Sequence, residues 1–357
     1  MGDRLDVIMQ GTVFLDIVMT GIPALPTAGT ELDATGMGSA PGGVANLAVA
    51  TSRLGLRTGL AASFGDDVYG DFLWQTLESQ GGVDLSLSRR IDGWHSPVTV
   101  SLAVDRDRAM VTHAHESPFK DAEMIIDPPP AAAGVLHLTG EDLPWAARAR
   151  AAGTLLFGDV GWDATDSWSP DVLRQVSELD AFLPNNVEAM AYTRTDDPRI
   201  AMMALADDVP LVVITCGAQG AIGLDANTAE EEWVPALPVT AVDPTGAGDV
   251  FLAAFVLGTL RSWPLRQRMS FANLCAGLSV QQVGGSLAAP GWGDLADWLA
   301  GVQARAKAGS RQAAVLARSY GYLADVLPHG PTREVRRATA TIARASDAGP
   351  AGAADTR

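Results

Sequence analysis

The segment Asp-Pro-Thr-Gly-Ala-Gly-Asp at residues 243–249 immediately precedes a long apolar run that is predicted to be a helix. Gly246, Ala247 and Gly248 would place their backbone N–H groups at the N-terminus of that helix, where unsatisfied donors and the helix dipole attract an anion. Asp249 would lie beside the anion, an odd place for a carboxylate that does not handle a proton. A base next to donors that hold a phosphoryl group is what phosphoryl transfer requires. A simple helix cap is the alternative interpretation.

A second pair of glycines, Gly42 and Gly43, opens another stretch with helical spacing. Asn46 lies about one turn into this predicted helix and can both donate hydrogen bonds to a polyol and accept them. Asp16, just past the first predicted strand, can accept two hydroxyl hydrogens. Taken singly, these features are more typical of an ordinary helix start and of a solvated loop carboxylate.

The elements that must position these groups alternate between strands and helices, which is typical of a parallel sheet covered on both faces. The predicted strands are Asp6–Thr12, Thr58–Phe64, His137–Thr139, Leu155–Asp159, Ala181–Pro184, Leu211–Thr215 and Val239–Val242, and the predicted helices are Gly42–Leu54, Asp71–Gln80, Val250–Leu260 and Met269–Val283. Two segments, Thr30–Ser39 and Pro97–His113, alternate apolar and polar residues, as half-exposed antiparallel strands do. We therefore expect a three-layer α/β/α domain with a mainly parallel central sheet and a small β lid.

Composition excludes several classes of protein. The chain has 357 residues, 47% hydrophobic and 19% charged, which is an ordinary globular mix. Its net charge of −17 argues against nucleic acid as a partner. No segment reaches the roughly 18 uninterrupted apolar residues that a membrane span needs. For this reason we expect no membrane partner. Two Cys cannot make a disulfide framework, so we expect a reducing, cytoplasmic location.

Together, these segments resemble the two signature regions of the PfkB (ribokinase-like) carbohydrate kinases. Residues 42–46 (Gly-Gly-Val-Ala-Asn) are similar to the first signature and residues 243–249 to the second. Residues 185–188 (Asn-Asn-Val-Glu) resemble the family's Asn-x-x-Glu motif, and residues 215–220 (Thr-Cys-Gly-Ala-Gln-Gly) resemble its phosphate loop. The match runs in order from about residue 5 to 300.

The resemblance implies a ribokinase-like fold and the transfer of the γ-phosphoryl group of ATP to a hydroxyl of a sugar or sugar-like substrate. It implies that Asp249 is the base and that the amides of residues 246–248 form the anion hole. The residues implied to bind the sugar are Asp16, Gly42, Gly43 and Asn46. The residues implied to lie along the nucleotide are Asn185, Thr215, Gly217, Gly220 and Asn273.

The resemblance also implies two cations. Glu188 would hold Mg²⁺, through water, because Mg²⁺ keeps several waters and needs few protein carboxylates. Asp243 and Thr245 match positions that in the family help to hold a monovalent cation such as K⁺.

We expect a kinase domain at 1–300, with its lid at about 12–39 and 93–115. A helical appendage at 301–344, outside the resemblance, and a disordered tail at 345–357 would follow it. Exposed lid strands could pair two chains as a homodimer. Two other functions stay open. A nucleoside kinase of the same fold would need base contacts such as Phe14, Trp94 and Met110, and a non-catalytic sugar-binding paralogue would keep the fold without turnover.

His113 and His115 are two residues apart on a predicted strand and so share a face, as metal ligands do. The sequence offers no nearby Cys and no third clear ligand. We therefore interpret the pair as lid-edge or substrate contacts.

Overall fold

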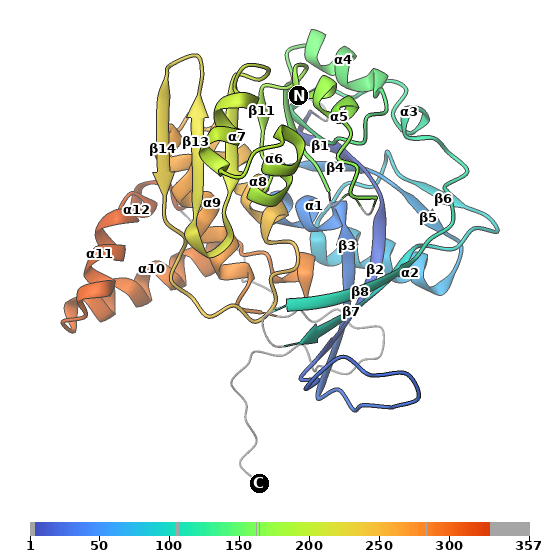
Figure 1. The fold of residues 1–357 in the computed structure, drawn as a ribbon, viewed down its shortest axis with the longest axis horizontal. Coiled ribbons are helices and arrows are strands. Elements are labelled where there is room, and N and C mark those ends of the chain that lie inside the picture. The colour runs from blue at the N-terminus through green and yellow to red at the C-terminus, as the bar shows by residue number, and fades with distance from the viewer. Residues whose placement is uncertain (1–3, 105–106, 162, 164, 283, 329–357) are drawn as a thin grey trace.

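The computed structural model describes residues 4–104, 107–161, 163, 165–282 and 284–328. The strands of its main sheet are β1 (Leu5–Gln10), β4 (Thr58–Ala61), β9 (Ala131–His137), β10 (Leu155–Asp159), β11 (Ala181–Phe182), β12 (Leu211–Thr215), β13 (Ala221–Asp225) and β14 (Glu230–Val234). They lie in the order β14-β13-β12-β11-β10-β9-β1-β4, and only β13 and β14 join the sheet antiparallel (Figure 1). The mainly parallel α/β fold that the sequence predicts is confirmed.

Helices cover both faces of this sheet because its strands are apolar on both sides. In β12, Leu211 and Val213 pack into one apolar cluster, whereas Val212 and Ile214 pack into the other, as expected for a buried parallel strand. The helices of the first cluster are α1 (Val44–Arg53), α2 (Val68–Thr76) with its π-helical continuation η1 (Leu77–Gly81), α8 (Ala247–Leu260), α9 (Leu265–Ser279) and α10 (Trp292–Lys307). The helices of the second are α3 (Asp121–Met124), α4 (Pro144–Ala151), α5 (Pro170–Val176), α6 (Asn186–Thr193) and α7 (Pro198–Leu205).

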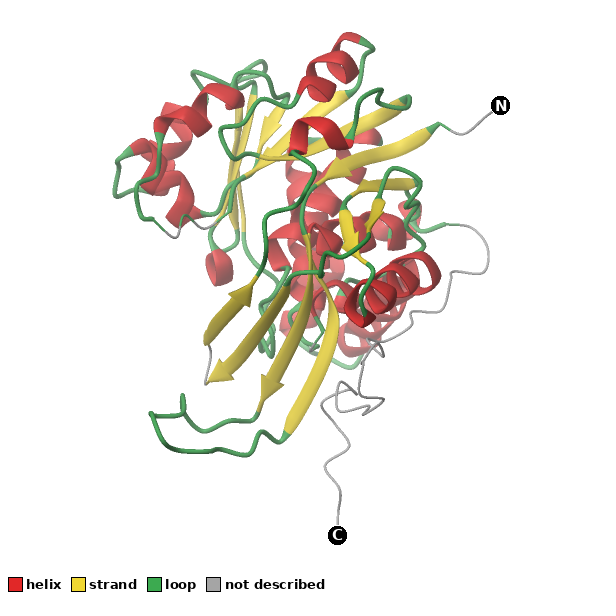
Figure 2. Cartoon of the chain, turned by 90° about the vertical axis from the view of Figure 1, so that its right-hand side faces the viewer, coloured by secondary structure: helices red, strands yellow, loops and turns green. Residues whose placement is uncertain are grey.

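A four-stranded sheet projects from this body, as Figure 2 shows. Its strands are β2 (Val13–Thr20), β3 (Gly36–Gly43), β7 (Val98–Val104) and β8 (Asp107–His113), in the order β3-β2-β7-β8. It is the small sheet that the alternating segments predict. The glycine pair at 42–43 ends β3 instead of lying inside the following helix, because the whole of β3 pairs with β2. A separate two-stranded sheet joins β5 (Ser63–Gly65) to β6 (Arg89–Ile91).

Three sequence predictions about strands are wrong, wholly or in part. Of Thr30–Ser39, only the part from Gly36 onward is a strand, and residues 30–35 are loop. Val239–Val242 forms no strand, and the backbone N–H groups of Val242 and Asp243 donate instead to the carbonyl of Val280, just past α9. The strand predicted at His137–Thr139 lies earlier, since β9 ends at His137. At 239–242 β-branched and apolar residues are present, but no described strand pairs with them. At 137–139 the pairing with β10 ends with His137 opposite Asp159 and the bond from Leu138 N to the Asp159 carbonyl.

The chain beyond the expected boundary at residue 300 packs onto the main core. Helix α10 runs across residue 300, and α11 (Arg311–Ser319) and α12 (Leu323–Val326) follow it. The side chains of Tyr320 and Leu323 are buried in the same apolar cluster as α8 and α9, and Trp298 meets Tyr320 edge-on. The tail expected at 345–357 lies outside the described residues.

We predict that Leu323→Ala lowers the free energy of unfolding by about 2–5 kcal/mol, because it leaves a cavity at a fully buried side chain. Val315→Ala on the exposed face of α11 is the matched control and should change stability by less than about 0.5 kcal/mol. Urea unfolding measures both. Equal, small effects would show that this segment is not part of the core.

Candidate active site

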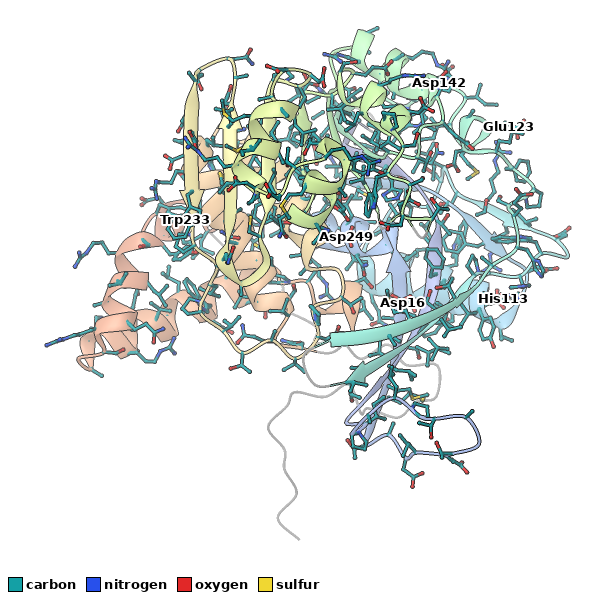
Figure 3. All side chains as sticks on the ribbon, in the orientation of Figure 1. Asp16, His113, Glu123, Asp142, Trp233 and Asp249 are labelled. Atoms are coloured by element: carbon teal, nitrogen blue, oxygen red, sulfur yellow. The ribbon has the colours of Figure 1, made fainter. Side chains whose placement is uncertain are left out.

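Several predicted site residues, together with Asp159, lie at the carboxyl ends of the parallel strands. Asp159 ends β10, Thr215 ends β12, and Asn185 follows β11. In open α/β sheets, ligands bind in the crevice outside these ends. Asp249 comes to this edge from α8, and Asp16 comes from the small sheet (Figure 3). The fold therefore brings together residues from the two halves of the chain.

The N-terminus of α8 is shaped by Gly246, which has a left-handed φ of 75°. A Cβ at this position would also lie 2.9 Å from Asn46 Cγ, so a side chain is excluded. Of the three amides expected in the anion hole, that of Ala247 donates to the carbonyl of Pro244 at 3.2 Å. Within the described part of the chain, no hydrogen bond engages the N–H groups of Gly246 or Gly248. Those two donors are therefore open to an anion.

Asp249 lies in the first turn of α8, half-buried. Its Oδ2 accepts a hydrogen bond from Asn46 Nδ2 at 3.1 Å. Desolvation raises the pKa of Asp249 to about 6, and the bond from Asn46 opposes that shift. Asn46 is itself buried, and its Oδ1 has no hydrogen-bond partner among the residues that the structure describes. A carboxylate with a pKa just below neutrality is well suited to accept a proton.

Asp159 is a site residue to which the sequence assigned no role. It ends β10, and its pKa is raised well above the ordinary value, first by desolvation and then by the charges of Glu188 and Asp249. Its Oδ1 accepts a hydrogen bond from the backbone N–H of Val160 at 2.7 Å. The signal available in the sequence was a single acidic residue at the end of a buried strand.

Glu188 is held in the first turn of α6 by a reciprocal cap with Asn185. Glu188 Oε2 accepts from the backbone N–H of Asn185 at 2.9 Å, and Asn185 Oδ1 accepts from the backbone N–H of Glu188 at 3.0 Å. Burial raises the pKa of Glu188 to about 7, the Asn185 bonds lower it, and the charge of Asp249 raises it further.

The charges of three carboxylates thus influence one another at this edge, and we call Asp159, Glu188 and Asp249 the carboxylate cluster. Their charges repel, as the raised pKa values of Asp159 and Glu188 record. A bound divalent cation would reverse this penalty. Carboxylate oxygens are the ligands that Mg²⁺ uses, so Glu188 and Asp159 are the residues that could hold it.

The residues expected to bind a sugar also meet. Asp16 on β2 pairs with Ala40 of β3, and a Cβ on Gly42 would lie 1.9 Å from Asp16 Oδ2. Gly43, with φ of 63°, caps α1, whose first turn carries Asn46. The absence of a side chain at Gly42 therefore lets the Asp16 carboxylate lie against the backbone just before α1.

Two of the residues expected along the nucleotide are brought together by a bridge between Asn185 and Thr215. Thr215 leads into the short helix η2 (Gly217–Gln219), and the loop closes where Cys216 N donates to Gly220 O at 2.7 Å. A Cβ at Gly220 would lie 2.0 Å from the carbonyl of Val234. This loop therefore packs closely against the segment that follows β14.

Asn273 contacts that same segment from α9. Its buried Nδ2 donates to the carbonyls of Val234 at 3.1 Å and Pro235 at 3.2 Å. These bonds anchor the segment that also contacts Gly220. Asn273 therefore supports one wall of the expected nucleotide site.

Asp243, one of the expected monovalent-cation ligands, fixes the turn before Gly246. It is buried, and its two oxygens accept from the backbone N–H groups of Thr245 at 2.9 Å and Gly284 at 3.4 Å. Thr245 Oγ1 is buried and lacks a partner within the described residues. The cation role of the pair stays a prediction.

A cavity of about 240 Å³ adjoins the sugar-binding turn. Phe14 and Trp94 line it, together with Phe119 and Gln10, whose buried Oε1 has no partner in the described chain. A Cβ at Gly43 would lie 2.7 Å from the Phe14 ring, which places the turn next to this cavity. Met110, the third expected base contact, is 55% exposed on β8 and does not line the cavity.

Comparison with known proteins agrees with this geometry. The family described as pfkB family carbohydrate kinase matches residues 11–291. A nucleoside kinase of Methanothermobacter thermautotrophicus is 30% identical over 261 residues, which are 71% of this chain and 82% of the relative. Probable fructokinase-5 of Arabidopsis thaliana is 27% identical over 292 residues, 74% of this chain and 90% of the relative.

The fold has solved counterparts. The structure of Arabidopsis thaliana ribokinase complexed with ribose and ATP superposes with a TM-score of 0.69 at 22% sequence identity, covering 81% of this chain and 96% of the ribokinase. The ribokinase-like fold is thereby confirmed.

We predict that Asp159→Asn raises the melting temperature at pH 8 in the presence of a chelator but not at pH 5. A carboxyl whose pKa is raised in the folded protein stabilises the fold at low pH, and this contribution is lost as the pH rises through the raised pKa. The substitution removes the charge responsible. Asp142→Asn, at an exposed carboxylate, is the control and should shift neither melt. A destabilised Asp159→Asn at pH 8 would contradict the repulsion.

Proposed function

The chain belongs to the pfkB family of carbohydrate kinases, phosphotransferases with an alcohol group as acceptor, and on that premise we propose that it transfers the γ-phosphoryl group of ATP to a hydroxyl of a sugar or sugar-like substrate. The observation that carries this proposal is Asp249. Its carboxylate, with its raised pKa, lies in the helical turn that also presents the open N–H groups of Gly246 and Gly248.

In the proposed reaction, Asp249 accepts the proton of the acceptor hydroxyl as the oxygen attacks the γ-phosphorus. The bond between this phosphorus and the bridging oxygen of ADP breaks, and the phosphoryl oxygens are held by the amides of Gly246 and Gly248. A pKa of about 6 leaves most Asp249 deprotonated at neutral pH, so it is ready to accept. Most of the remaining catalysis is positioning and charge stabilisation, as a loose phosphoryl-transfer transition state requires.

Mg²⁺ would be held by Glu188, through water, and by Asp159. When bound, it neutralises charge on the phosphates. The carboxylate cluster supports this assignment because two of its members are destabilised in the ionised form. We keep Asp243 and Thr245 as the candidate ligands of a monovalent cation, with the unpartnered Thr245 Oγ1 in support.

Asp16 and Asn46 would accept and donate hydrogen bonds to the substrate hydroxyls. Because Asp16 belongs to the small sheet and Asn46 to the main body, substrate binding would draw the two together. The small sheet would then act as a lid that excludes water, a competing acceptor for the phosphoryl group.

The small sheet also offers a surface for pairing two chains. Its edge strand β8 exposes Met110 and Val111, and unpaired strand edges invite pairing. We include a homodimer through this edge in the proposal. Among the described residues, no helix is both long and apolar enough to span a membrane.

We predict that Asp249→Asn lowers kcat by about 10²–10⁴-fold, because it removes the base, while the Kd for Mg·ATP stays within a few-fold. Asp171→Asn is the matched control, since Asp171 also lies in the first turn of a helix. It should retain near wild-type kcat. Steady-state kinetics and nucleotide titration measure the effects. Wild-type turnover by Asp249→Asn would show that another group is the base.

A nucleoside acceptor is the second candidate, favoured by the cavity beside the sugar-binding turn. Phe14, Trp94 and Phe119 give the cavity flat apolar walls, and Gln10 Oε1 offers an unused acceptor to an amino group. A bare sugar would leave these groups unused, whereas a nucleobase would fill them.

An ADP-release screen over hexoses, pentoses, sugar phosphates and nucleosides separates the candidates. If the acceptor is a free sugar, we expect Trp94→Ala to leave kcat/KM near wild type. If it is a nucleoside, we expect Trp94→Ala to lower kcat/KM by up to about tenfold through lost ring contact. Binding without turnover of any acceptor by the wild-type protein would instead favour the non-catalytic paralogue.

A further inference from the structure

Three histidines meet at the rim of the small sheet. His113 is the last residue of β8, His115 follows two residues later, and His95 lies in the loop before β7. Strand pairing explains the meeting, because His113 is opposite Val98 at the start of β7 and so lies close to the loop that carries His95. His113 is labelled in Figure 3, toward the side of the molecule away from β14.

The three imidazole rings pack against one another. The ring centroids of His95 and His115 are 4.6 Å apart, those of His95 and His113 are 5.0 Å apart, and those of His113 and His115 are 5.1 Å apart. One ring nitrogen from each residue lies within 4.8 Å of the other two. His113 and His115 are exposed and His95 is half-buried, so the cluster lies at the surface.

A hydrogen bond to the backbone orients the ring of His95. His95 Nδ1 lies 3.0 Å from the carbonyl oxygen of Ser96. A carbonyl oxygen can only accept, so Nδ1 carries the proton and Nε2 keeps its lone pair. Metal-binding histidines are typically oriented in this way, by a backbone carbonyl or carboxylate that accepts from the other ring nitrogen.

We propose that His95, His113 and His115 form a three-imidazole binding site for a divalent transition-metal ion of the Zn²⁺ type, separate from the Mg²⁺ site of the carboxylate cluster. Imidazole nitrogen is a preferred ligand of Zn²⁺, whereas Mg²⁺ prefers oxygen. Zn²⁺ binds histidine nitrogen at about 2.0–2.1 Å, which puts tetrahedral nitrogens about 3.3 Å apart. Rotation of the exposed His113 and His115 rings closes the remaining gap.

Metal binding here would join two segments of the cavity wall. Trp94 and Pro97 line the cavity on the His95 loop, and Ala114 and Glu116 line it after β8. The two segments already share one bond, from Trp94 Nε1 to the Glu116 carbonyl at 3.1 Å. The metal would fix the edge of the small sheet beside the acceptor cavity and leave a fourth coordination position to water.

Zinc binding by the untagged full-length chain, stripped with a chelator, tests this proposal. Equilibrium dialysis with Zn²⁺ in excess Mg²⁺ should give one Zn²⁺ per wild-type chain and a higher melting temperature. His113→Ala and His115→Ala should each weaken Zn²⁺ binding by at least about tenfold and abolish the thermal shift. Both positions are exposed, so the variants should fold.

Two controls locate the metal. Glu188→Gln should bind Zn²⁺ like the wild type, because its carboxylate belongs to the other site. His137→Ala, which removes a histidine at the end of β9, should also have no effect. Equal Zn²⁺ affinity in wild type, His113→Ala and His115→Ala, or loss of binding in Glu188→Gln alone, would overturn the proposal. Neither result depends on catalytic turnover, so the kinase proposal stands or falls separately.

Discussion

The burial of three carboxylates at one edge of the sheet, with the repulsion between them, is the constraint on which the proposed site depends. Asp159, Glu188 and Asp249 come from the end of a strand and from the first turns of two helices, and each has a raised pKa. Such an arrangement opposes folding at neutral pH, so it is not explained by stability. The arrangement fits the proposed chemistry, in which Asp249 accepts a proton and Glu188 and Asp159 hold a cation. Perturbed carboxyl groups of this kind concentrate at functional sites.

The rest of the fold holds that cluster in place. Parallel strands end together, which brings Asp159 to the same edge as Asn185 and Thr215. Asn46 of α1 donates a hydrogen bond to Asp249. The 284–289 segment is bound to α1, because Arg53 donates to two of its carbonyls, and to β3, because Ser286 donates to the carbonyl of Pro41. The small sheet adds Asp16 from outside the main core. The proposed base is therefore held by the main body, whereas Asp16 is held by the small sheet.

Local patterns predicted the parts of this site that are local in the chain. The segments 246–249 and 42–46 are short, and their glycines and polar residues indicate a helix start with a polar group beside it. Asp159 was not predicted as a site residue, because a single acid at a strand end has no spacing to mark it. Its pKa is raised first by burial and then by the charges of Glu188 and Asp249, and all of these depend on the folded structure. The sequence likewise did not predict that His95 lies beside His113, because only the pairing of β7 with β8 brings the two together. Val239–Val242 had strand-like residues but no partner strand.

We propose that Asp249 is a desolvated base and that a cation binds close enough to affect its pKa. A pH titration of its carboxyl carbon by NMR, with and without Mg²⁺ and ADP, tests this most directly. The account predicts a midpoint near pH 6 in the metal-free protein and a lower midpoint when the cation is present. A midpoint at the ordinary value of about 3.9, unmoved by Mg²⁺, would contradict it.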